Sequence, residues 1–108
     1  MGIWIPLWMS YNDKVFNTDM KFSDLDFQTH PVWSDGVQAK HFFDNGYGVS
    51  VIRSLNSYGG SEGLYEAAVL KGNEDNYEVY YETDITDDVL GHQNEEQIES
   101  VLSQIQKL

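Results

Sequence analysis

From residue 37, side chains alternate between apolar and polar in two consecutive runs, 37–43 and 47–53. This period of two is typical of strands that bury one face. The turn sequence between the runs is Asp44-Asn45-Gly46. A three-residue loop with Gly46 in the left-handed conformation collects the apolar residues of both strands on one face, whereas a two-residue loop divides them between faces. The pattern therefore predicts a hairpin with a three-residue loop and a G1 bulge.

Two more strands are expected, over residues 64–71 and 77–83, with a turn cluster of Gly, Asn, Glu and Asp at 72–76 between them. Four consecutive strands with short connections indicate an antiparallel meander. The residues expected to face the core are Tyr65, Ala67 and Val69 in the third strand and Tyr77, Val79 and Tyr81 in the fourth; those expected on the outer face of the fourth are Glu78, Tyr80 and Glu82.

The C-terminal residues carry the clearest helix signal. Asn94 can act as N-cap, and Gln97 three residues later completes a capping box. Segment 86–91 reads as a short capped turn that ends at Gly91. The fold class predicted is α+β, an antiparallel four-stranded meander packed against one C-terminal helix. The apolar stripe of that helix, spaced by three and four residues, is Ile98, Val101, Leu102, Ile105 and Leu108.

The 108 residues are enough for one domain, and we assign residues 20–108 to it. Residues 1–19 form an apolar and aromatic N-terminal arm or leader, in which Pro6 disfavours a helix through Trp4 and Trp8. This arm is an edge segment packed on the domain, an optional leader, or an interface arm that docks on a partner or a sister subunit, and the last alternative includes a homodimer. Its apolar run is too short to span a bilayer.

The net charge of −12 is concentrated near the C-terminus. Residues 73–108 carry ten acidic side chains against Lys107 alone. Such a surface disfavours direct contact with nucleic acid or an anionic membrane and favours a basic protein partner. The other interpretation is that the acidity only maintains solubility. The ten acidic residues are Glu74, Asp75, Glu78, Glu82, Asp84, Asp87, Asp88, Glu95, Glu96 and Glu99.

Motifs for catalysis or metal binding are not found in the sequence. It has no cysteine, and its three histidines, His30, His41 and His92, lack metal-ligand spacing. His41 falls on the apolar face of the first strand, where a core or rim histidine is expected. The serines lack a nucleophile-elbow setting, and the Tyr58-Gly59-Gly60-Ser61 loop lacks the lysine of a phosphate-binding loop. We therefore expect no cofactor, no metal and no enzymatic activity.

Three stretches, 45–53, 57–66 and 83–91, resemble small, uncharacterised tailed-phage proteins. The likeness begins near Met20 and covers most of the chain after it. It brings no site residues. It implies a context in which small acidic phage proteins disable the nucleic-acid machinery of the host, as anti-CRISPR proteins and DNA-mimic inhibitors do.

The leading hypothesis is a phage-type inhibitor in the cytoplasm of the infected host, which presents an acidic face to a basic, nucleic-acid-binding host protein. The alternative is a phage assembly or accessory protein with an aromatic partner surface; a small hydrolase ranks third. The expected partner-binding residues are Glu78, Glu82, Asp84, Asp87, Asp88, Glu95 and Glu96 for the acidic face, and Trp4, Trp8 and Tyr58 for the aromatic surface.

Overall fold

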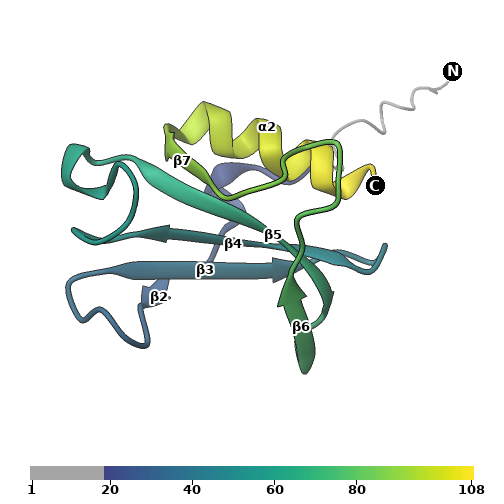
Figure 1. The fold of residues 1–108 in the computed structure, drawn as a ribbon, viewed down its shortest axis with the longest axis horizontal. Helices are drawn as coiled ribbons and strands as arrows, with labels where there is room; N and C mark the ends of the chain where they lie inside the picture. The colour runs from purple at the N-terminus through teal and green to yellow at the C-terminus, as the bar shows by residue number, and fades with distance from the viewer. Residues whose placement is uncertain (1–18) are drawn as a thin grey trace, which may run out of the picture.

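The structure is a computed structural model and describes residues 19–108. The arm predicted at residues 1–19, with Trp4 and Trp8, therefore lies outside the described residues apart from Asp19. Figure 1 shows one sheet with a helix over one of its faces. The elements in chain order are η2 (Phe22–Asp24), β2 (Gln28–Thr29), β3 (Val37–Phe42), β4 (Tyr47–Arg53), η3 (Gly60–Glu62), β5 (Tyr65–Asn73), β6 (Asn76–Val79), β7 (Leu90–Gln93) and α2 (Glu95–Gln106).

The α+β class, with an antiparallel sheet and one C-terminal helix, is confirmed, but the count of four strands is wrong. The sheet has six strands in the order β2-β3-β4-β5-β6, with β7 paired to β5. One edge of β5 pairs with β4, and the other edge is shared by β7 near its start and β6 near its end. The backbone N–H of Tyr80 donates to the Val69 carbonyl at 2.8 Å, beyond the end of β6.

The hairpin between β3 and β4 has the predicted register. His41 pairs with Val49, and the N–H of Phe43 donates to the carbonyl of Tyr47 at 2.8 Å across the three-residue loop. Gly46 has φ +87°, the left-handed conformation that glycine adopts without a Cβ penalty. The three-residue turn that Gly46 permits gives the same register that burial of the apolar residues requires. This register puts the alternating apolar residues on the face beneath α2.

Helix α2 begins at its predicted cap. The Asn94 side chain accepts the N–H of Gln97 at 2.8 Å, and the Gln97 side chain accepts the N–H of Asn94 at 2.8 Å. Leu108 was expected in the apolar stripe but lies beyond the helix and is 42% exposed. Each fully buried aliphatic side chain contributes about 1.5–3 kcal/mol of transfer free energy. The helix residues in the core are Ile98, Val101, Leu102 and Ile105; the sheet residues beneath them are Ala39, Val49, Val51, Tyr65, Ala67 and Val69.

The hairpin turn also caps the far end of the helix. The side-chain amide of Asn45 donates to the carbonyl of Ile105 at 2.9 Å and to that of Gln106 at 3.2 Å. Its carbonyl oxygen accepts the N–H of Tyr47 at 3.1 Å. The last carbonyls of a helix lack the usual partner four residues ahead, and this side chain adds a donor there beside the N–H of Leu108, which bonds to the Ile105 carbonyl at 3.1 Å. Asn45 thus joins the two layers of the fold.

The predicted faces of the fourth strand are wrong. Strand β6 ends at Val79, and its two-residue turn sets the register Gly72↔Tyr77 and Leu70↔Val79. Tyr77 and Val79 consequently lie on the same face as Leu70, opposite α2, where they remain 40% and 42% exposed. Tyr81, also expected in the core, is 45% exposed. Because the turn contains two residues, even-numbered residues of β5 pair with odd-numbered residues of β6. The odd-numbered residues that were expected to face the core therefore lie on the opposite face of the sheet.

Segment 86–91 is not a capped turn that ends at Gly91. The Thr86 hydroxyl accepts the N–H of Asp88 at 3.1 Å and forms a local turn, and Leu90–Gln93 then forms strand β7. Gly91 lies inside that strand, where a Cβ would stand 2.5 Å from the Cβ of Tyr58. A short strand of this kind depends on a partner distant in sequence, and here the partner is β5.

Candidate functional site

Acidic side chains collect on the helix layer of the molecule. Ile85, in the segment between β6 and β7, packs on the core and borders the Gln97 flank of α2. On the opposite flank, the carboxylate of Glu99 accepts the N–H of Phe22 at 2.7 Å. We call nine carboxylates the acidic helix layer. They are Glu82, Asp84, Asp87 and Asp88 in the segment before β7, Glu95, Glu96 and Glu99 on α2, and Asp19 and Asp24 in the segment that ends with η2.

Most of the predicted acidic residues belong to this layer, but Glu78 does not. Glu78 lies on the β5–β6 hairpin, opposite Lys71 in the register. Glu78 and Glu82 were expected on the outer face of one strand, but β6 ends at Val79 and does not reach Glu82. Asp19 and Asp24 were missed: their chain segment reaches α2 only through the tertiary contact between η2 and the helix. No local sequence pattern indicates that contact.

Three of the five described basic side chains lie over tyrosine rings. A cation is attracted to the negative face of an aromatic ring, which holds these charges at fixed places on the sheet. The pairs are Lys40 with Tyr77 at 4.9 Å, Arg53 with Tyr65 at 5.0 Å and Lys71 with Tyr80 at 4.6 Å, each measured to the ring centroid. The other two described basic residues, Lys21 and Lys107, are exposed and lie beside η2 and at the end of α2.

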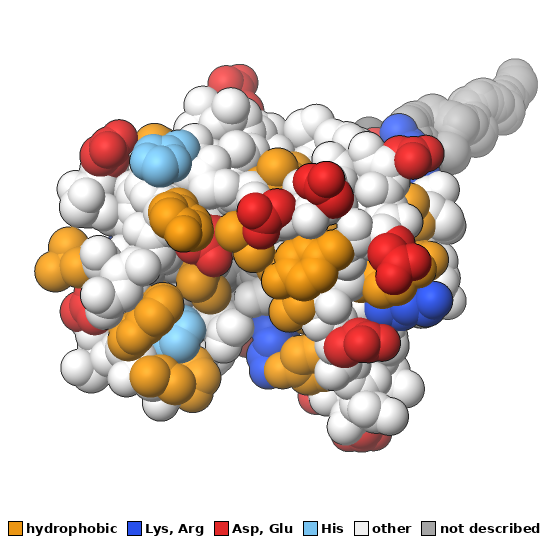
Figure 2. Space-filling view, in the orientation of Figure 1, with side chains coloured by type: hydrophobic (Ala, Val, Ile, Leu, Met, Phe, Trp, Pro, Cys, Tyr) orange, Lys and Arg blue, Asp and Glu red, His pale blue; other side chains and the backbone are white. Residues whose placement is uncertain are grey.

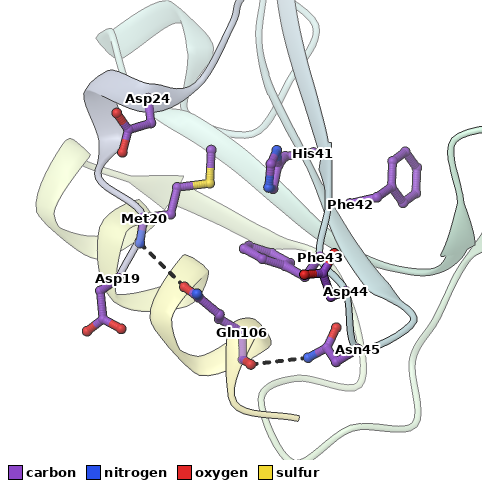
Figure 3. A pocket seen from close by; sticks show the side chains of 9 residues that line it. All are labelled: Asp19, Met20, Asp24, His41, Phe42, Phe43, Asp44, Asn45 and Gln106. Carbon is purple, nitrogen blue, oxygen red and sulfur yellow. Dashed lines mark hydrogen bonds between the residues drawn. The ribbon is translucent and has the colours of Figure 1, made fainter. Parts of the chain in front are cut away.

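A hollow of about 690 Å³ lies between the hairpin turn and the residues before η2. Figure 3 shows His41, in β3, and Phe43, directly after β3, projecting toward Met20 and the helix, while Phe42 projects to the other side of the sheet. The backbone N–H of Met20 donates to the Gln106 side chain at 3.4 Å and closes one wall. Carboxylates at the rim disfavour an anionic ligand such as a phosphate. They are Asp19, Asp24 and Asp44.

The histidines are separated in the structure. His41 is half-buried at the rim of the core with its ring 4.8 Å from that of Phe43, in agreement with the sequence expectation. His30 stacks on Trp33, and His92 lies in β7 with φ +55°. Within residues 19–108, no group of three potential ligands is placed to hold a metal ion.

Tyr58, predicted as an aromatic contact, is 65% exposed in the loop before η3. Val32 and Leu55, which the sequence did not single out, are more exposed still. An isolated apolar residue in a polar loop carries no sequence signal of its exposure, so these two could be found only in the structure.

Neither protein-family models, nor curated proteins, nor solved structures match this chain. In the described part of the chain, no helix has the length and apolar character needed to cross a membrane.

Proposed function

We propose that this chain is a non-enzymatic, phage-type inhibitor that binds a basic, nucleic-acid-binding host protein through its acidic helix layer, in the cytoplasm of the infected host. The observation that carries the proposal is the excess of carboxylates on α2 and on the two chain segments beside it. These segments carry nine carboxylates, with Lys21 and Lys107 as their basic residues, and three other cations are each held over a tyrosine ring. A surface of one sign attracts a partner of the other and speeds their encounter.

The resemblance to small tailed-phage proteins supports a host protein as the partner, and the charge supports a partner that normally binds a polyanion. Carboxylates on exposed loops and helix turns can occupy the positions where such a protein holds phosphates. The acidic helix layer is built from three chain segments, which gives it width as well as length. The sequence alone placed Glu78 and Glu82 on one face of a single strand, so the observed arrangement of carboxylates over three segments differs from that expectation.

The test compares two triple charge reversals with the same change in net charge. Glu82, Asp84 and Asp87 are changed to lysine in the acidic helix layer, and Glu74, Asp75 and Glu78 are changed to lysine on the β5–β6 hairpin as the matched control. All six side chains are exposed, so both variants are expected to fold, which circular dichroism checks. Each protein is then used to capture binding proteins from a bacterial lysate, and the captured proteins are identified by mass spectrometry.

We expect wild type and the hairpin variant to capture a basic, nucleic-acid-binding protein and to displace DNA or RNA from it. The acidic-layer variant should bind it roughly tenfold or more weakly, mainly through slower association. Binding should also weaken as salt rises, because ions screen exposed charges. Equal binding by all three proteins would mean that the acidity serves only solubility.

The alternative, a phage assembly or accessory protein with an aromatic partner surface, was centred on Trp4, Trp8 and Tyr58. The two tryptophans lie outside the described residues, so only the exposure of Tyr58 supports it at present. Such an interface would respond little to salt, which separates it from the acidic-layer proposal in the same assay.

A further inference from the structure

The three most exposed large hydrophobic side chains of the described residues share one end of the sheet. Val32 is 77% exposed, Leu55 is 72% exposed and Tyr58 is 65% exposed. Val32 lies in the loop that enters β3, and the other two lie in the loop that leaves β4, so antiparallel pairing brings both loops to the same end. We call these three residues the loop-end patch. Figure 2 shows hydrophobic and histidine side chains together at this end, on the left.

The loop that leaves β4 is held by hydrogen bonds rather than by burial of its apolar side chains. The Ser57 hydroxyl accepts the N–H of Ser54 at 2.9 Å and donates to the Ser54 carbonyl at 3.0 Å. The N–H of Leu55 donates to the carboxylate of Asp35 at 2.8 Å, which ties this loop to the loop before β3. Leu55 is thus presented outward from a fixed backbone.

The loop before β3 is fixed in the same way. The Nδ1 atom of His30 accepts the N–H groups of Val32 and Trp33, each at 3.1 Å, and its ring stacks on Trp33 with centroids 4.7 Å apart. Gly36 has no room for a side chain, because a Cβ there would stand 2.6 Å from the Cβ of Ser54. The two loops therefore pack directly on each other.

Both the N–H and the carbonyl of Tyr58 are held by hydrogen bonds. Its N–H donates to the carboxylate of Glu66 at 3.0 Å, and its carbonyl accepts the N–H of His92 at 3.0 Å. Among residues 19–108, His92 is the non-glycine residue with positive φ, +55°, a conformation that costs free energy outside glycine. Gly59, next to Tyr58, has φ +90°, which glycine adopts without a Cβ penalty. The backbone of Tyr58 is therefore fixed before any partner arrives.

An apolar surface held rigid in this way is suited to binding a protein. Binding loses less conformational entropy when the loops are already ordered, and tyrosine is enriched among the residues that dominate interface energies. Single exposed apolar residues are ordinary on protein surfaces, but these three lie on two loops that pack on each other at one end of the sheet.

The charges around the patch define the partner. Residues 30–36 and 54–66 include Asp35, Glu62 and Glu66 but no lysine or arginine. The nearby Arg53 is held over the Tyr65 ring at 5.0 Å. A second copy would bring carboxylates against carboxylates, and a nucleic acid would bring phosphates, so both are disfavoured. We infer that the loop-end patch binds a protein segment in which aromatic or aliphatic side chains are flanked by lysine or arginine.

This inference does not require the acidic helix layer to bind anything, and its experiment separates the two. Random peptides displayed on ribosomes are selected for binding to the full chain, and the peptide with the strongest enrichment is synthesised. We expect aromatic or aliphatic residues next to lysine or arginine. Amide chemical shifts of the ¹⁵N-labelled chain should move in residues 30–36 and 54–60 when the peptide is added.

Substitution of Leu55→Ser or Tyr58→Ser should weaken the peptide roughly tenfold or more while the amide spectrum elsewhere stays unchanged. The matched control is Leu108→Ser, which removes an exposed leucine at the other end of the sheet and should leave affinity unchanged. The triple lysine variant of the acidic helix layer should still bind the peptide. Three results overturn the inference: no enriched peptide, enriched peptides without basic residues, or a wild-type dimer that Leu55→Ser dissociates.

Discussion

The two ends of the sheet use side-chain hydrogen bonds for opposite purposes. At the hairpin end, Asn45 reaches across to the helix and joins two buried layers. At the loop end, Ser57 and Asp35 bond to the backbone of their own and the adjacent loop, and they leave Leu55 outside. The first end gains stability from its polar contacts, and the second gains a fixed shape. The contact that joins the two layers and the exposed apolar residues therefore lie at opposite ends of the sheet, so each can be changed without the other.

The largest effect should come from the core between these ends. Leu102 is fully buried at the centre of the apolar stripe of α2. The change Leu102→Ala removes buried methyl groups and leaves a cavity, at a cost of about 2–4 kcal/mol in the free energy of unfolding. Urea denaturation measures it. Gln104→Ala, on an exposed position of the same helix, should stay within about 0.5 kcal/mol. Similar losses from both variants would contradict the burial of this face.

A smaller effect is expected at the hairpin end. Asn45→Ala removes a donor to the carbonyls of Ile105 and Gln106 and the acceptor for the N–H of Tyr47. The expected cost is about 1–2 kcal/mol, because hydrogen bonds of this kind contribute near 1 kcal/mol each when partly exposed. Thermal unfolding measures it, with the exposed neighbour Asp44→Ala as control. If Asn45→Ala is neutral, the turn and the helix are joined by packing alone.

The smallest effect should be at the loop end. Leu55→Ser exchanges a side chain that is 72% exposed and should change stability by less than about 0.5 kcal/mol. Urea denaturation of this variant beside Asn45→Ala compares the two ends directly. A loss as large as that of Asn45→Ala would show that Leu55 belongs to the fold, and the contrast between the two ends would then disappear.

The parts of the fold that sequence reasoning predicted correctly are those with two local signals in agreement. In the β3–β4 hairpin, Gly46 and the alternation of apolar residues specify the same register. At the start of α2, the Asn94 cap and the apolar stripe specify the same helix. Each signal lies within a few residues of the element that it predicts, so no distant contact is needed.

The errors lie where the deciding contact is distant or where the two faces look alike. In 77–83, tyrosines alternate on both faces, and only the two-residue turn at Glu74-Asp75 decides that Tyr77 faces away from the helix. Strands β2 and β7 are too short to show a period and exist through their partners. For the candidate site, charge could be counted from the sequence, but the approach of Asp19 to Glu96 and Glu99 required the packing of η2 on α2.

The free edges of the sheet limit how another chain can pair with this protein. They are β2, with two residues, β6 and β7, with four residues each, and the part of β3 beyond Gln38, whereas the long strand β5 has both of its edges occupied. Short edge strands provide little backbone for another chain to extend, which limits both aggregation and strand addition by a peptide. We therefore expect any partner of this protein to contact its side chains rather than to add a strand to its sheet.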